Sequence, residues 1–116
     1  MHEVPYPAEN RRRSEFEIQA ELYNQLQEEG LNVRGEVKAY KSRLDIVVFD
    51  DDNQAILIIE TKSWSRKKKR TETKQLKKYK RLFDIPVLVC GRLSQINETV
   101  EKVINIYQEH YIDNLL

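Results

Sequence analysis

The chain has 116 residues, which is the size of one ordinary domain and leaves no room for a second catalytic module. Its 40% hydrophobic and 34% charged residues exclude a disordered chain, and no apolar run approaches the roughly 20 residues of a membrane span, so we expect a cytoplasmic protein. The net charge of +1 excludes a uniformly basic protein but hides a local block, because residues 61–82 hold eleven Lys or Arg and one acid, Glu72.

The first clear helical pattern begins at Ser14. Residues 1–13 hold two prolines and a basic triplet, and we expect them to form a leader before a single domain of residues 14–116. Ser14 and Glu17 have the spacing of a helix-capping box, and the apolar residues that follow recur at helical intervals. Gly30 is typical of the residue after a helix. The pattern predicts a helix that starts at Ser14 and ends just before Gly30.

Three strand-like runs follow this helix, over residues 32–40, 44–49 and 55–59. The second run is rich in β-branched residues and ends at an acidic turn, residues 50–53. Short turns of this kind join neighbouring antiparallel strands, so we expect the second and third runs to form a hairpin.

The rest of the chain alternates between helical and strand-like patterns. Residues 71–83 carry apolar side chains at helical spacing, residues 85–90 predict a short strand that ends in a buried Cys90, and Ser94 can cap a last helix. The order α-β-β-β-α-β-α predicts an α/β fold, a mixed sheet flanked by helices. Core packing and a homodimer contact explain equally well the apolar stripe of the last helix: Ile96, Val100, Val103, Ile104, Tyr107 and Tyr111.

Charged residues stand in or next to two of the apolar strands. Glu60 and Lys62 follow four apolar residues and, two positions apart, point to the same side of a strand. Asp45 has a comparable place on the preceding strand, so the predicted hairpin brings the two carboxylates together. Two carboxylates beside a lysine suit a Mg²⁺ or Mn²⁺ ion and phosphodiester hydrolysis. At this point a cross-strand salt bridge explains the three residues equally well.

Asp45, fourteen intervening residues and then Glu60-Thr61-Lys62 resemble the motif of the PD-(D/E)xK nuclease superfamily, which has the restriction-endonuclease-like fold. The resemblance covers about residues 14–92, although the proline that often precedes the family's aspartate is absent. It implies an α-β-β-β-α-β core, followed here by a C-terminal helix. It also implies that the two carboxylates bind metal and that Lys62 assists the attacking water.

Further residues resemble one branch of this superfamily. Gln75 and Tyr79 resemble the QxxxY motif of the branch with type I restriction motor-subunit nuclease domains and RecB-like nucleases, which implies that they position the metal site and its phosphate. Glu15 resembles an acidic residue of the first helix in such families and would extend the metal site. Glu36 is a further acidic candidate, or else faces solvent at an edge strand.

The basic block lies between the Glu60-Thr61-Lys62 motif and the next helix. A run of like charges fits either a solvated surface or a phosphate-binding surface, and its place after the motif favours the second. The resemblance implies DNA rather than RNA as the partner. We expect sequence-independent contacts from Arg66, Lys67, Lys68, Lys69, Arg70, Lys74 and Lys78.

These features together predict a Mg²⁺- or Mn²⁺-dependent deoxyribonuclease, an endonuclease with little sequence specificity, with Asp45, Glu60 and Glu15 as metal ligands. Two alternatives remain open: a nucleic-acid-binding module of the same fold without catalysis, and a nuclease that acts on RNA. The chain would work as a homodimer or as a subunit of a larger complex, and no membrane contact is expected.

Overall fold

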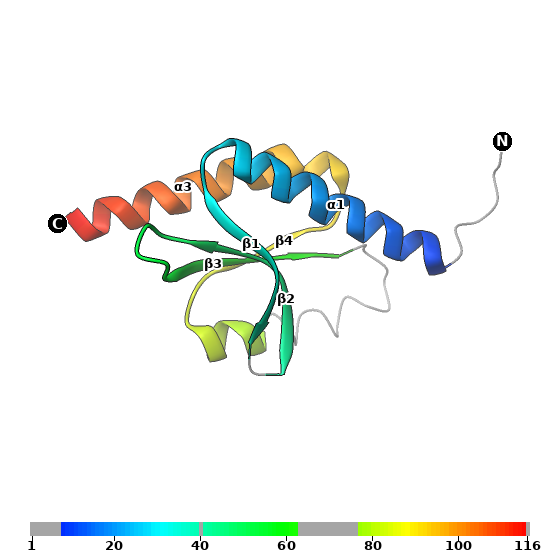
Figure 1. Cartoon of the computed structure of the whole chain (residues 1–116), viewed down its shortest axis with the longest axis horizontal. Helices are drawn as coiled ribbons and strands as arrows, with labels where there is room; N and C mark the ends of the chain where they lie inside the picture. The colour runs from blue at the N-terminus through cyan, green and yellow to red at the C-terminus, as the bar shows by residue number, and fades with distance from the viewer. Residues whose placement is uncertain (1–7, 40, 63–76, 116) are drawn as a thin grey trace.

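The computed structural model describes residues 8–39, 41–62 and 77–115 (Figure 1). The elements are α1 (Ala8–Glu28), β1 (Asn32–Ala39), β2 (Ser42–Phe49), β3 (Ala55–Thr61), β4 (Val87–Cys90), the 3₁₀ turn η1 (Leu93–Gln95) and α3 (Ile96–Leu115). Residues 77–83 add a helical segment before β4. The predicted order of elements is therefore confirmed. No helix in this part of the chain is long and apolar enough to cross a membrane.

The strands form one mixed sheet in the order β1-β2-β3-β4. β2 pairs antiparallel with both β1 and β3, whereas β4 runs parallel to β3. The hairpin predicted around the acidic turn is confirmed, since Ile46 pairs with Ile59 and Val48 with Leu57. β3 lies inside the sheet between two partners, which explains why its residues form a nearly continuous apolar run.

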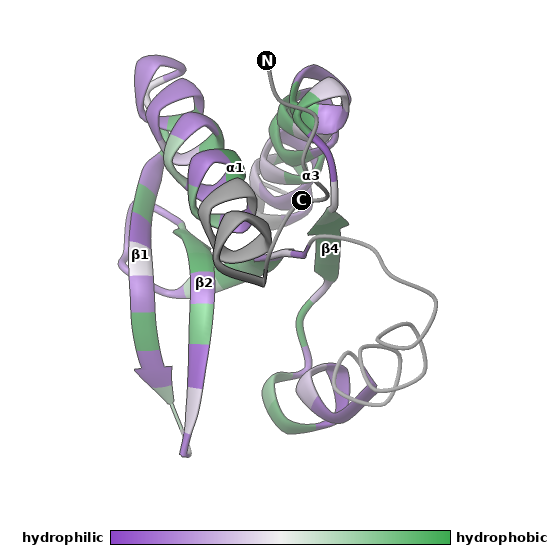
Figure 2. Cartoon of the chain, turned by 90° about the vertical axis from the view of Figure 1, so that its right-hand side faces the viewer, coloured by the Kyte–Doolittle hydropathy of each residue, from purple (hydrophilic) through white to green (hydrophobic). Residues whose placement is uncertain are grey.

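Helices cover both faces of the sheet (Figure 2). On one face, Leu22 of α1 and Val103 of α3 pack in one core with the strand residue Ile46. On the other face, the helical residues 77–83 place Tyr79 in a second, smaller core. The first core also contains Cys90, which the sequence predicts to be buried. It includes Ile96 and Val100 of the apolar stripe as well, so core packing accounts for this part of the stripe.

The hairpin of β1 and β2 bends sharply beside Asp45. Glu36 has a φ of 56°, a left-handed value that interrupts the regular strand, and the pairing resumes beyond it. Leu44 and Val47 lie in the same core, although residues three apart on a regular strand face opposite sides. The outer part of the hairpin therefore turns toward the helical residues 77–83, as Figure 1 shows.

The helix ends differ from the prediction at two places. α1 begins at Ala8 rather than at Ser14, because residues 8–13 contain neither Gly nor Pro and continue the helix upstream of the capping pattern. Ser94 lies inside η1 and does not cap α3. The end of α1 agrees with the prediction, since Gly30 follows it with a φ of 82°.

Candidate active site

Asp45 lies at the bend of the β1–β2 hairpin and faces the end of β3. The register of β2 and β3 places it opposite Glu60. The backbone N–H of Thr61 donates a hydrogen bond of 2.8 Å to Asp45 Oδ2, and the Thr61 hydroxyl donates one of 3.2 Å to the same oxygen. From α1, Gln19 Nε2 donates to the Asp45 carbonyl oxygen at 3.1 Å. Asp45 is therefore held in place both from β3 and from α1.

Glu60 carries a buried carboxyl group beside Asp45 and Lys62. Only 2% of the residue is exposed, and its Oε1 atom has no hydrogen-bond partner among the described residues. Burial raises the pKa of Glu60 to about 9, the Asp45 carboxylate adds to this rise, and Lys62 opposes it. The two carboxylates lie close enough to interact, as the sequence predicts, and their mutual repulsion favours a proton on Glu60 at neutral pH.

Lys62 follows β3 at the point where β4 ends. Thr61 pairs with Cys90, and the backbone N–H of Lys62 donates to the Cys90 carbonyl oxygen at 3.2 Å. The side chain of Lys62 is half-buried, and its charge acts on Glu60 by lowering the pKa of that group. The ion pairs within the described ranges include none between Lys62 and either carboxylate. A simple cross-strand salt bridge does not explain the three residues.

Tyr79 packs beneath the face of the sheet that carries Glu60. The tyrosine is 2% exposed, shares a core with Ile58, and meets the ring of Phe83 edge to face, with 6.0 Å between the ring centroids. Ile58 and Glu60 are two residues apart on β3 and so share a side of the strand. Gln75, the other half of the QxxxY resemblance, lies outside the described residues.

The two other acidic candidates do not join Asp45 and Glu60. No three His, Cys, Asp or Glu side chains of the described ranges come together closely enough to hold a metal ion, so Glu15, half-buried on α1, is not grouped with the pair. Glu36 is exposed on the edge strand, accepts a hydrogen bond from Gln19 at 3.3 Å, and forms an ion pair with Arg43 at 3.2 Å.

Part of the predicted DNA-binding surface falls within the described residues. Lys78 is exposed, as are its neighbours Lys77, Lys80 and Arg81 on the same helical segment. The remaining predicted contacts lie outside the described part of the chain: Arg66, Lys67, Lys68, Lys69, Arg70 and Lys74.

The sequence pattern misses two residues that hold Asp45 in place. Thr61 occupies the variable position of the Glu60-Thr61-Lys62 motif, and its hydroxyl between two charged residues was the only signal for a polar role. Gln19 follows Glu15 by one helical turn, and only that spacing indicated that it faces the sheet.

The sequence of the chain matches the model of a known protein family. The family model described as the N terminus of the type I restriction enzyme R protein (HSDR_N) matches residues 2–111. The chain belongs to this family. Membership confirms the type I restriction part of the resemblance and connects this R-protein N-terminal domain with restriction. Neither the curated proteins nor the solved structures gave a match.

Proposed function

We propose that this R-protein N-terminal domain is a divalent-metal-dependent nuclease of the PD-(D/E)xK type that hydrolyses DNA phosphodiester bonds, as an endonuclease with little sequence preference. The observation that supports this most directly is the buried Glu60 carboxylate, which lies beside Asp45 and Lys62 and whose Oε1 lacks a partner among the described residues. A buried carboxylate without compensation costs folding free energy. Strongly perturbed carboxylates with a specific charged neighbour are typical of functional sites.

The chemistry of this pair fits a divalent cation. Carboxylate oxygens are the ligands that Mg²⁺ and Mn²⁺ prefer, and Glu60 Oε1 has no donor in the described protein to compete for it. Thr61 binds one oxygen of Asp45 and thereby fixes the direction of the carboxylate group. A cation would also offset the repulsion that raises the pKa of Glu60. When bound, the ion supplies Lewis-acid polarisation of a phosphate oxygen and of water.

The side chains of the site have separate roles in hydrolysis. Asp45 and Glu60 would hold the ion, and Glu60 would have to be deprotonated to do so. Lys62 keeps a positive charge beside the phosphate and stabilises the negative charge that builds up during attack. In the reaction a water oxygen bonds to phosphorus, the bond from phosphorus to the leaving sugar oxygen breaks, and that oxygen takes up a proton. Tyr79 supports this face from below, and the QxxxY resemblance implies that Gln75 positions the phosphate.

DNA is the substrate that the surroundings of the site favour. The exposed cations of residues 77–81 suit the phosphate backbone of DNA. The backbone is the same for every base sequence, so binding would be salt-sensitive and largely sequence-independent. The family is named for a segment of a restriction enzyme, which supports DNA as the target and a larger complex as the setting.

The proposal is tested by incubating supercoiled plasmid with the chain and Mg²⁺ or Mn²⁺. Wild-type protein should nick or linearise the plasmid, and EDTA should stop the reaction. Glu60→Gln should lower the rate by about a thousandfold or more, since several kcal/mol of transition-state stabilisation depend on the bound ion. The matched control, Glu101→Gln, changes an exposed carboxylate of α3 in the same way and should cut at the wild-type rate.

Each other outcome has a clear meaning. Shifted plasmid bands without cutting support a binding module of the same fold, and cutting of an RNA duplex but not of DNA identifies a ribonuclease. Calorimetric titration with Mn²⁺ separates metal binding from activity. Equal Mn²⁺ affinities for the wild type and Glu60→Gln would contradict the metal site itself.

A further inference from the structure

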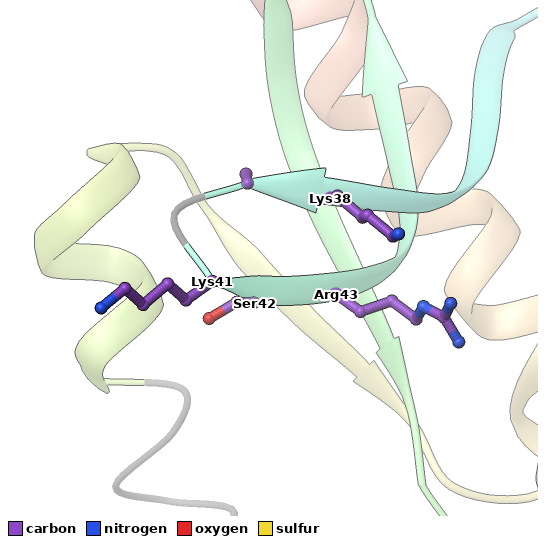
Figure 3. A pocket seen from close by; sticks show the side chains of 5 residues that line it. Lys38, Lys41, Ser42 and Arg43 are labelled. Carbon is purple, nitrogen blue, oxygen red and sulfur yellow. The ribbon is translucent and has the colours of Figure 1, made fainter.

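The outer part of the β1–β2 hairpin carries a compact group of cations, Lys38, Lys41 and Arg43, which we name the basic hairpin (Figure 3). All three residues are exposed. Together with Ala39 and Ser42 they line an open hollow of about 380 Å³. Lys38 and Arg43 extend to the same side of the hairpin, whereas Lys41 extends from its tip toward the other side.

Two positive charges of the basic hairpin repel each other across the strand pair and lower its stability. Lys38 is the direct cross-strand partner of Arg43, and like charges in directly opposite positions destabilise a sheet. Glu36 pairs with Arg43 at 3.2 Å, but both side chains are well exposed, so water screens this pair. Lys38 forms no ion pair with an acid of the described residues. An arrangement that costs the fold stability indicates an anionic ligand.

The basic hairpin begins close to the candidate active site, since Arg43 is two residues from Asp45. The bend at Glu36 and Asp45 turns it toward the helical residues 77–83, and Ala39 packs against the same small core as Phe83. A strand rises about 3.3 Å per residue, so the backbone at Arg43 lies about 7 Å from Asp45, and that at Lys41 about 13 Å. Phosphates that flank one phosphodiester bond of duplex DNA lie within such a range.

We infer that the basic hairpin binds the phosphates of duplex DNA that flank the phosphodiester bond held at Asp45 and Glu60. The inference rests on the proposed function and adds to it a second contact surface, separate from the exposed cations of residues 77–81. The positive side chains of the hairpin contact backbone phosphates and make no contacts with the bases. Its contribution to binding therefore depends on salt and not on sequence.

The test measures the salt dependence of DNA binding by fluorescence anisotropy, in EDTA so that no cutting occurs, with a labelled duplex between 50 and 200 mM KCl. Lys38→Gln and Lys41→Gln should each lower the magnitude of the slope of log affinity against log salt by about 0.9, and the double variant should bind roughly sixtyfold more weakly at 100 mM. The control, Lys102→Gln, removes one exposed positive charge from α3 and should leave the slope unchanged.

A second variant at Lys41 distinguishes a loss of DNA contact from a change in folding. Lys41 has a φ of 75°, which glycine adopts without strain, so Lys41→Gly removes the same charge while easing the backbone. It should match Lys41→Gln in slope. If wild-type protein neither binds nor cuts DNA, the proposed function fails. If it binds, and the hairpin variants keep the slope of Lys102→Gln, the inference alone is overturned.

Discussion

The two ends of the β2–β3 hairpin each bury a carboxylate, and they treat it in opposite ways. At the turn, Asp50 is 5% exposed and its Oδ1 accepts hydrogen bonds of 2.9 Å from the backbone N–H groups of Asp52 and Gln54. His110 lies 3.1 Å from its other oxygen. At the far end, Glu60 is 2% exposed and its Oε1 has no partner within the described chain. The same hairpin therefore supplies hydrogen-bond donors to one carboxylate and leaves an oxygen of the other without a donor among the described residues.

The pKa values of the two groups follow from this difference. The N–H of Gln54 lowers the pKa of Asp50, since hydrogen bonds to the charged form favour it. Burial raises the pKa of Glu60 to about 9. The fold can supply donors to a buried carboxylate, as the turn demonstrates, and it supplies none in the described part of the chain to Glu60 Oε1. The contrast separates a carboxylate that stabilises the structure from one that is available to a ligand.

The largest expected effect is that of Asp45→Asn on plasmid cutting, with the same exchange at Asp50 as its control. Asp45→Asn should reduce plasmid cutting by about a thousandfold, because it removes one of two negative charges that hold the ion. Thr61 can still donate to the new side chain, so the fold is kept. Asp50→Asn removes a charge of the same kind and should cut at the wild-type rate at 25 °C. Equal losses in the two variants would mean that Asp45 is only structural.

Local sequence patterns were sufficient to predict most of the fold and the central residues of the site. The acidic turn after residues 44–49 predicted the hairpin, and the alternation of strand side chains placed Glu60 and Lys62 on one side. The hairpin alone indicated that Asp45 and Glu60 approach each other, but their exact register could not be predicted, because the pairing of β2 and β3 shifts between Val48 and Phe49.

Features that depend on tertiary contacts could not be predicted. The bend at Glu36 needs a positive φ at a residue other than glycine, which the packing of the outer hairpin imposes and no local pattern signals. The start of α1 was wrong because the Ser14 pattern is compatible with a helix interior as well as with a cap. The double hydrogen bond from Thr61 to Asp45 depends on how closely two strands approach.

The second effect concerns stability in the absence of metal. Between pH 4.5 and about 9 the folded protein keeps a proton on Glu60 that the unfolded chain releases, so this group makes the free energy of unfolding fall as pH rises. Glu60→Gln removes this cost and can donate its amide N–H to Asp45. It should stabilise the protein in EDTA by at most about 3 kcal/mol at pH 7 and by almost nothing at pH 4.5. Urea unfolding at both pH values measures this, with Glu101→Gln as the control; a difference independent of pH would contradict the raised pKa.

The third effect is the pH dependence of metal binding. If Mn²⁺ replaces the proton of Glu60, its affinity should rise by up to about tenfold per pH unit and level off near pH 9. Calorimetry at pH 6 and 7, in two buffers of different ionisation enthalpy, measures both the affinity and the number of protons released. An affinity that is unchanged between these pH values, with no proton release, would show that the ion does not displace that proton.

The smallest effect belongs to the compensated end of the hairpin. Asp50 has a lowered pKa, so its contribution to stability is present above its ordinary value of 3.8 and is lost as the pH falls through the lowered value. Asp50→Asn keeps an acceptor for the N–H of Gln54 but loses the charge that faces His110. The melting temperature should fall by roughly a few degrees at pH 6, where Asp50 carries its charge, and by less at pH 3. Thermal melts of both proteins at the two pH values test this, and a larger loss at pH 3 would contradict the idea that Asp50 stabilises the turn through its charge.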